Sequence, residues 1–120
     1  MKITVKEEDG IYTSFKTEGH AGFAEEGYDI VCAGVSALVI NFINSIDELC
    51  DDKFEFNKSD DFGESSSEAD IIEFRFISIP SKDAQLLFKS LVIGLKDIQN
   101  SYGTEFVQVD IIWKDGKSSC

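Results

Sequence analysis

The sequence lacks long hydrophobic stretches and has little proline, with Pro80 the only one in 120 residues. No continuous apolar run approaches the ~20 residues that a helix needs to cross a bilayer. The N-terminus alternates polar and apolar side chains, where a secretory signal would be continuously apolar. We therefore expect a cytoplasmic protein that does not interact with a membrane.

Cysteine is scarce and is not arranged in pairs. Cys32, Cys50 and Cys120 are odd in number and form no CxxC motif, which is typical of reduced thiols rather than a disulfide framework. A metal site would have to use His20, Cys32 and Cys50 with nearby carboxylates, and no spacing resembles a structural zinc site. We therefore expect neither a bound metal nor a cofactor.

Positive charge is also scarce. Eleven basic residues, of which only Arg75 is arginine, face 23 acidic ones, and the formal net charge is −12. Such a chain repels phosphate backbones, so direct nucleic-acid binding is disfavoured. The same field attracts a basic protein partner, although by itself it could serve only solubility.

The length and the hydrophobic pattern predict one α+β domain over residues 1–120. Alternating residues around an Asp9-Gly10 turn predict a hairpin whose second strand ends near Glu18. Further along, the patterns predict a loop over 19–28, a helix over 29–49, a strand at 54–56, an acidic mobile loop over 57–70, a strand over 72–76, a helix from Ser81 to Gly103, and a strand over 107–113 with one buried face.

This ββαββαβ order favours a two-layer sandwich in which both helices cover one face of a mostly antiparallel sheet. After the first strand, the remaining order is that of ferredoxin-like folds. The predicted helix 29–49 has a core stripe from Val31 to Leu49, and Ile30 and Ile40 widen it until its first half is apolar nearly all round. Such a helix is buried on several sides, by its own sheet and by a partner subunit.

The most informative stretch is Gly19-His20-Ala21-Gly22, followed by Gly27-Tyr28-Asp29-Ile30-Val31-Cys32-Ala33-Gly34-Val35-Ser36. With Asp29 as N-cap, Cys32 falls at the third position of the helix, where unpaired backbone N–H groups cluster. Thiols at helix N-termini ionise more readily, and the thiolate is the reactive form. His20 lies on the loop before this helix, which allows a nucleophile–base pair with Cys32.

Each of these residues also has a purely structural interpretation. A free cysteine commonly acts as a small buried hydrophobe, and a lone loop histidine is commonly just solvated. Asp29 would be needed as a helix cap in any case, and Ser36 could bond back to a helix carbonyl. The Gly19–Gly22 segment superficially matches the GxxG loop of KH domains, but its acidic flanks contradict that interpretation.

The motif closely resembles that of the ribosomal-processing cysteine proteases, the Prp family of Firmicutes and related bacteria. The likeness rests on Gly19-His20-Ala21 and on Asp29-Ile30-Val31-Cys32-Ala33 with Ser36, and it extends to the Asp83-Ala84-Gln85-Leu86 segment. The resemblance implies a cysteine-protease domain in which Cys32 is the nucleophile and His20 the general base, with Gly19, Asp29, Ala33 and Ser36 in support.

The resemblance also implies a substrate and an oligomeric state. Members of the family remove an N-terminal extension from large-subunit ribosomal protein twenty-seven during ribosome assembly, and they form homodimers. A chain of net charge −12 suits such a basic ribosomal substrate. The alternative hypothesis is a non-catalytic, ribosome-associated binding protein in which Cys32 is only structural.

Overall fold

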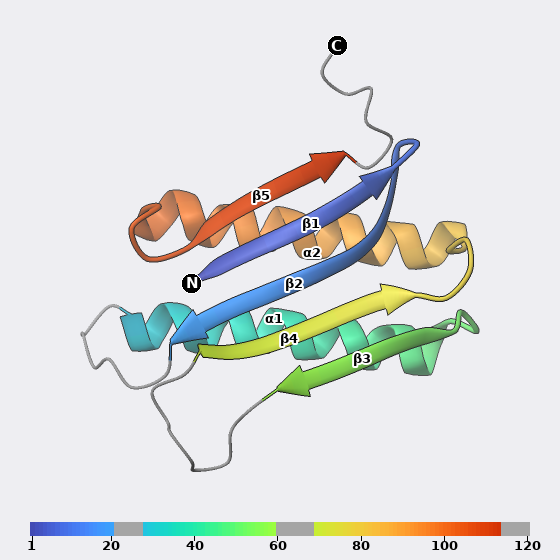
Figure 1. Ribbon diagram of the computed structural model, residues 1–120, viewed down its shortest axis with the longest axis horizontal. Coiled ribbons are helices and arrows are strands. Elements are labelled where there is room, and N and C mark those ends of the chain that lie inside the picture. Colours follow the sequence, from blue (N-terminus) through green and yellow to red (C-terminus); the bar gives the residue numbers. More distant parts are fainter. Residues whose placement is uncertain (21–27, 60–68, 114–120) are drawn as a thin grey trace.

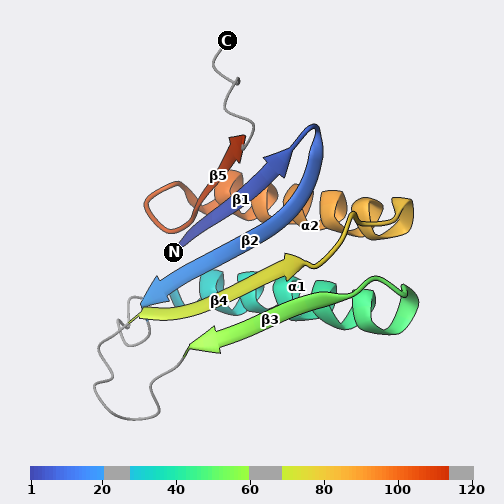
Figure 2. The ribbon, with the colours of Figure 1, turned by 45° about the vertical axis from the view of Figure 1, so that its right-hand side comes forward.

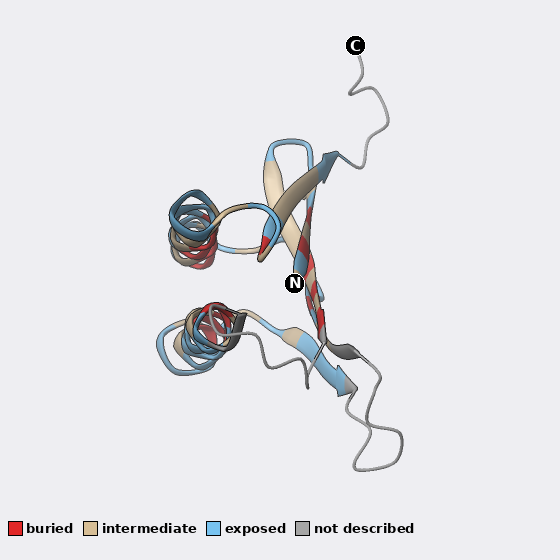
Figure 3. Ribbon diagram, turned by 90° about the vertical axis from the view of Figure 1, so that its left-hand side faces the viewer, coloured by how far each residue is buried: buried red, intermediate tan, exposed pale blue. Residues whose placement is uncertain are grey.

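The structure is a computed structural model that describes residues 1–20, 28–59 and 69–113. Over these ranges the elements are β1 (Lys2–Glu8), β2 (Ile11–His20), α1 (Tyr28–Leu49), β3 (Phe54–Ser59), β4 (Ala69–Phe76), α2 (Lys82–Tyr102) and β5 (Gln108–Trp113). The strands form one sheet in the order β3-β4-β2-β1-β5, as Figure 1 shows. Both helices cover the same face (Figure 3). The predicted two-layer α+β sandwich is confirmed.

The sheet is mostly antiparallel, as predicted. Only the β1–β5 pairing is parallel among the strands that the structure describes. The likeness to ferredoxin-like folds holds for the order of elements along the chain. In the sheet, β1 is inserted between β2 and β5, because the hairpin places β1 on the side of β2 that is not occupied by β4.

The predicted hairpin turn is confirmed, whereas the predicted end of β2 is wrong. Asp9 and Gly10 have φ angles of 56° and 82°, the pair of positive values that a two-residue Asp-Gly turn requires. β2 continues beyond Glu18 because Gly19 and His20 pair with Asp70 and Ala69 of β4. Gly19 and His20 therefore belong to a strand rather than to the predicted loop.

The core lies between the helices and the sheet and is rich in phenylalanine. Phe74 stacks on Phe15 with ring centroids 5.3 Å apart, and Phe88 of α2 approaches Phe15 edge-on at 5.7 Å. The helices approach each other closely at two glycines. A Cβ on Gly94 would lie 3.0 Å from a methyl of Leu38, and one on Gly34 would lie 3.4 Å from Ile98.

Helix α1 differs from the prediction in two respects. Residues Ile30–Leu49 are long and apolar enough to cross a bilayer by length and composition, so the expectation that no such segment exists was wrong. In this fold the segment is a core helix, because its residues Val31, Val35, Val39, Phe42, Ile43 and Ile46 are buried in the hydrophobic core. Leu49, predicted to be part of the core stripe, is 72% exposed because it is the last residue of the helix.

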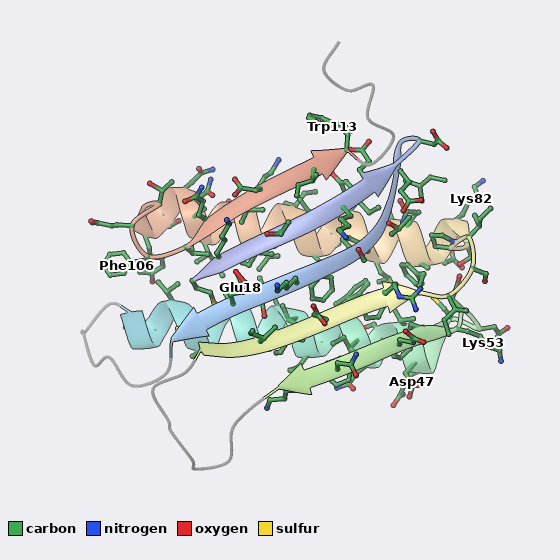
Figure 4. All side chains as sticks on the ribbon, viewed as in Figure 1. Glu18, Asp47, Lys53, Lys82, Phe106 and Trp113 are labelled. Carbon is green, nitrogen blue, oxygen red and sulfur yellow. The ribbon has the colours of Figure 1, made fainter. Side chains whose placement is uncertain are left out.

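The other boundaries agree in part. Ser81 caps α2 by accepting a hydrogen bond from the Ala84 N–H at 3.1 Å, and Gly103 ends the helix, both as predicted. The predicted loop 57–70 is shorter at both ends, since β3 extends to Ser59 and β4 begins at Ala69; residues 60–68 lie outside the described ranges. The buried face predicted for β5 is incomplete, because Trp113, labelled in Figure 4, is 54% exposed at the sheet edge.

Candidate active site

The end of β2 and the start of α1 lie at the same end of the sheet. β2 finishes at His20 and α1 starts at Tyr28, and both ends are close together in Figures 1 and 2. The fold therefore brings the backbone of His20 and the first turns of α1, which carry Cys32, to one place. The intervening residues 21–27 and the side chains of His20 and Asp29 lie outside the described part of the chain.

Cys32 is a free, partly exposed thiol in the second turn of α1. The helix begins at Tyr28, so Asp29 is inside the first turn, and the prediction that it is the N-cap was wrong. Cys32 is consequently the fifth helical residue rather than the third. The unpaired N–H groups at the helix start belong to residues that precede Cys32.

The neighbours of Cys32 on α1 divide between the core and the surface. Val31 and Val35 are buried and fix this part of the helix against the core, whereas Ala33 and Ser36 are exposed. Ser36 is four residues after Cys32, so the two side chains lie one above the other on the same flank of the helix. The thiol thus stands at the boundary between the core and the solvent.

Gly19 is buried at the end of β2, opposite the first residue of the chain. A Cβ on Gly19 would lie 2.7 Å from the terminal methyl of Met1, so the Met1 side chain occupies the space beside this glycine. Met1 was not identified from the sequence, because a regular two-residue turn at Asp9-Gly10 would place it across from Glu18. The register shift between Lys6 and Glu7 moves it opposite Gly19.

Cys50 lies just beyond the other end of α1, far along the helix from Cys32. Burial raises the pKa of the Cys50 thiol, and the carboxylates of Asp52, Asp83 and Asp51 raise it further. A thiol that resists ionisation is a weak nucleophile near neutral pH. Of the two cysteines that the structure describes, Cys50 is therefore the poorer candidate.

Two hollows in the described residues lie away from Cys32. One of about 530 Å³ is next to the β1–β2 turn and is lined in part by Ile11, Ile77 and Pro80. Another of about 520 Å³ crosses the sheet face opposite the helices, with Lys16 and Glu73 in its lining. The lining of neither hollow includes Cys32, so the candidate site is defined by the chemistry of α1 and the end of β2.

Comparisons with known proteins agree with the motif. A family model described as cysteine protease Prp matches residues 1–107. The ribosomal processing cysteine protease Prp of Staphylococcus aureus strain Mu50 is 32% identical over 102 residues, which are 85% of this chain and 89% of that protein. Its counterpart in Bacillus subtilis strain 168 is 36% identical over 91 residues, 74% of this chain and 77% of that one.

A solved structure shows the same arrangement. The crystal structure of an essential ribosomal processing protease Prp from S. aureus, in complex with a covalently linked product peptide, superposes with a TM-score of 0.76. The two sequences are 27% identical there, and the match covers 92% of this chain and 97% of the other. The likeness therefore extends over nearly the whole length of both chains.

Proposed function

This chain belongs to the cysteine protease Prp family, and we propose from that membership that Cys32 is its nucleophile and His20 its general base. The protein is a ribosomal-processing cysteine protease. The observation that supports Cys32 most strongly is its place as a free, partly exposed thiol near the start of α1, beside the end of β2. A peptide linked covalently to the S. aureus relative supports nucleophilic catalysis, because the acyl-enzyme intermediate of that mechanism is covalent.

The proposed reaction has two halves. His20 takes the proton from the thiol of Cys32, and the sulfur attacks the scissile carbonyl carbon. As the tetrahedral intermediate collapses, His20 gives that proton to the leaving amine, and a thioester to Cys32 remains. Water, deprotonated by His20, then attacks the thioester and releases the acid and the free thiol.

The supporting residues act around this step. The unpaired N–H groups at the start of α1, where Asp29 lies in the first turn, would stabilise the oxyanion. Ser36, one turn beyond Cys32, leaves that flank of the helix open to a substrate, and Gly19 leaves room for the Met1 side chain at the end of β2. Residues 1–120 would thus act as one protease domain that uses neither metal nor cofactor.

The substrate class is a ribosomal protein, and we place it more narrowly as the extended precursor of large-subunit protein twenty-seven, processed in the cytoplasm. A basic ribosomal protein is attracted by a net charge of −12. The rival function is a non-catalytic, ribosome-associated binding protein, in which the substrate would bind and remain intact.

The test is mass spectrometry of the extended precursor after incubation with the wild type, Cys32→Ala, His20→Ala and the control Cys50→Ala. We expect cleavage by the wild type and by Cys50→Ala, none by Cys32→Ala, and most of the rate lost in His20→Ala. Binding of an intact precursor by the wild type would support the rival function. Cleavage at the wild-type rate by folded Cys32→Ala would exclude the dyad.

We also propose that a second copy of the chain packs against α1. The exposed stripe consists of Ile30, Ala33, Ala37 and Ile40, and Ile30 and Ile40 are 61% and 42% exposed. No charged residue occurs between Ile30 and Ile46, although 28% of the whole chain is charged. The alanines permit close approach of two helices. When the stripe of one copy packs on the same stripe of a second copy about a two-fold axis, both stripes are covered completely.

The dimer is tested by sedimentation of Ala37→Glu at micromolar concentration. A buried charge at the centre of the stripe should give a monomer, whereas the wild type should sediment as a dimer. The matched control is Ile93→Glu, which changes a residue 67% exposed on α2 and should remain dimeric. A monomeric wild type, or a dimeric Ala37→Glu, contradicts this interface.

A further inference from the structure

Met1 lies on the inward face of the sheet, next to the strand end that carries His20. Lys2 pairs with Glu18, so the next position along the hairpin sets Met1 opposite Gly19. The side chains of Ile3 and Val5 on β1, and of Phe15 and Thr17 on β2, are buried on this face. The Met1 side chain completes the row, and its terminal methyl stands 2.7 Å from the position that a Gly19 Cβ would take.

The backbone of Met1 is held at both of its polar ends. Its amino group donates a hydrogen bond to the carbonyl oxygen of Phe106 at 2.8 Å, and its own carbonyl oxygen accepts one from the Gln108 N–H at 2.9 Å. Its side chain packs against the hydrophobic core. Figure 4 shows Phe106 at the end of the sheet where β2 finishes. Met1 is therefore fixed by the segment that leads into β5.

The last two residues of β2 are supported unequally on their two sides. On one side Gly19 and His20 pair with Asp70 and Ala69 of β4. On the other side the pairing with β1 ends at Glu18. The Met1 side chain lies against Gly19 on this second side, where β1 provides no further strand pairing.

We propose that Met1 is a positioning residue for His20, which rests on the proposed role of His20 as general base. Packing of the Met1 side chain on Gly19 fixes the backbone from which the imidazole projects. Proton transfer depends steeply on that geometry, because a displacement of about 1 Å can cost about a hundredfold in rate. A side chain at position 19 would displace the terminal methyl of Met1 from this place.

The experiment uses full chains whose first residue is set by cutting an N-terminal fusion directly before position 1. The wild type, Met1→Leu and Met1→Ala are compared in kcat and KM on the extended ribosomal precursor. The ring-proton resonances of His20, the sole histidine, are followed by NMR. The control is Ile46→Val, which weakens the core near the other end of α1.

We expect Met1→Ala to lower kcat about tenfold with KM within twofold, and Met1→Leu to stay within about twofold of the wild type. The His20 resonances should shift in Met1→Ala and coincide with the wild type in Ile46→Val. A wild-type kcat in Met1→Ala, or an equal loss in Ile46→Val, overturns the role of Met1. Cys32→Ala is assayed before the Met1 variants, because cleavage by Cys32→Ala would overturn the proposed function itself.

Discussion

Asp52 joins the end of α1 to the start of α2, and its removal should destabilise the protein measurably. Its carboxylate accepts hydrogen bonds from the backbone N–H and from the hydroxyl of Ser81, each at 2.7 Å. Ser81 is itself the N-cap of α2. Lys53 and Lys82, the neighbours of these two residues in sequence, are labelled at the same end of the molecule in Figure 4.

The magnitude follows from these contacts. A typical hydrogen bond contributes about 0.5–1.5 kcal/mol net, and solvent exposure places these two in the lower half of that range. A carboxylate at a helix N-terminus adds about 0.3–1 kcal/mol. We therefore expect Asp52→Ala to lower the free energy of unfolding by about 2 kcal/mol, or the melting temperature by roughly 8 °C for a chain of this size.

Urea denaturation of Asp52→Ala, Ser81→Ala and the double variant measures this link. Ser81→Ala should lower the free energy of unfolding by about 1 kcal/mol, because it removes the helix cap and the hydrogen bond from the Ser81 hydroxyl to Asp52. The double variant should be less destabilised than the sum, with a coupling of about 0.5–1 kcal/mol. A loss below about 0.5 kcal/mol in Asp52→Ala, or strict additivity of the two substitutions, would show that the Asp52–Ser81 hydrogen bonds do not stabilise the fold. Cleavage activity should be unchanged, since this link lies at the opposite end of α1 from Cys32.

Three further predictions concern ionisation and the turn. Burial raises the pKa of the Cys50 thiol and of the Tyr12 phenol, and nearby carboxylates raise both pKa values further. The ordinary pKa values of these groups are 9.0 and 10.0. Above them the unfolded chain loses protons that the folded chain still holds. The free energy of unfolding is therefore unaffected by these two groups below about pH 9 and falls as pH rises further. Because Tyr12→Phe removes one of the two groups, it should flatten the fall in melting temperature between pH 8 and pH 11. Iodoacetamide at pH 8.5 should modify Cys50 faster in Asp52→Asn than in the wild type, as followed by peptide mapping; an unchanged rate would contradict the assigned carboxylate effect. Gly10→Ala should cost about 1–2 kcal/mol in urea denaturation, because the φ of 82° is unfavourable for a side chain; a neutral result would show that the turn relaxes.

The elements with strong local signals could be predicted from the sequence. The Asp9-Gly10 turn requires two positive φ values that this dipeptide tolerates, and Ser81 and Gly103 are characteristic helix caps. The end of β2, which was predicted wrongly, and the strand order, which the sequence leaves open, depend on partners distant in sequence. β2 continues to His20 because β4 pairs with it, and β1 enters the sheet between β2 and β5 for reasons that no local pattern contains.

The candidate site was predictable in composition and less so in geometry. The spacing of the motif identified Cys32. The helix begins at Tyr28, two residues before the first helical position expected with Asp29 as the cap, so Asp29 is not its cap. Met1 was missed because its contact with Gly19 is made across two strands and is visible only once their register is known. The exposed, uncharged stripe of α1 could be anticipated, since an apolar helix face must be covered somewhere.

The central claim is that Cys32 forms a covalent thioester with the substrate during cleavage. The most direct measurement is to quench a reaction of the wild type with its extended precursor in acid, digest the protein, and locate the acyl group by mass spectrometry. We expect a substrate-derived acyl group on the peptide containing Cys32, absent in Cys32→Ala. Cleavage with the acyl group on Cys50, or cleavage by folded Cys32→Ala, would contradict it.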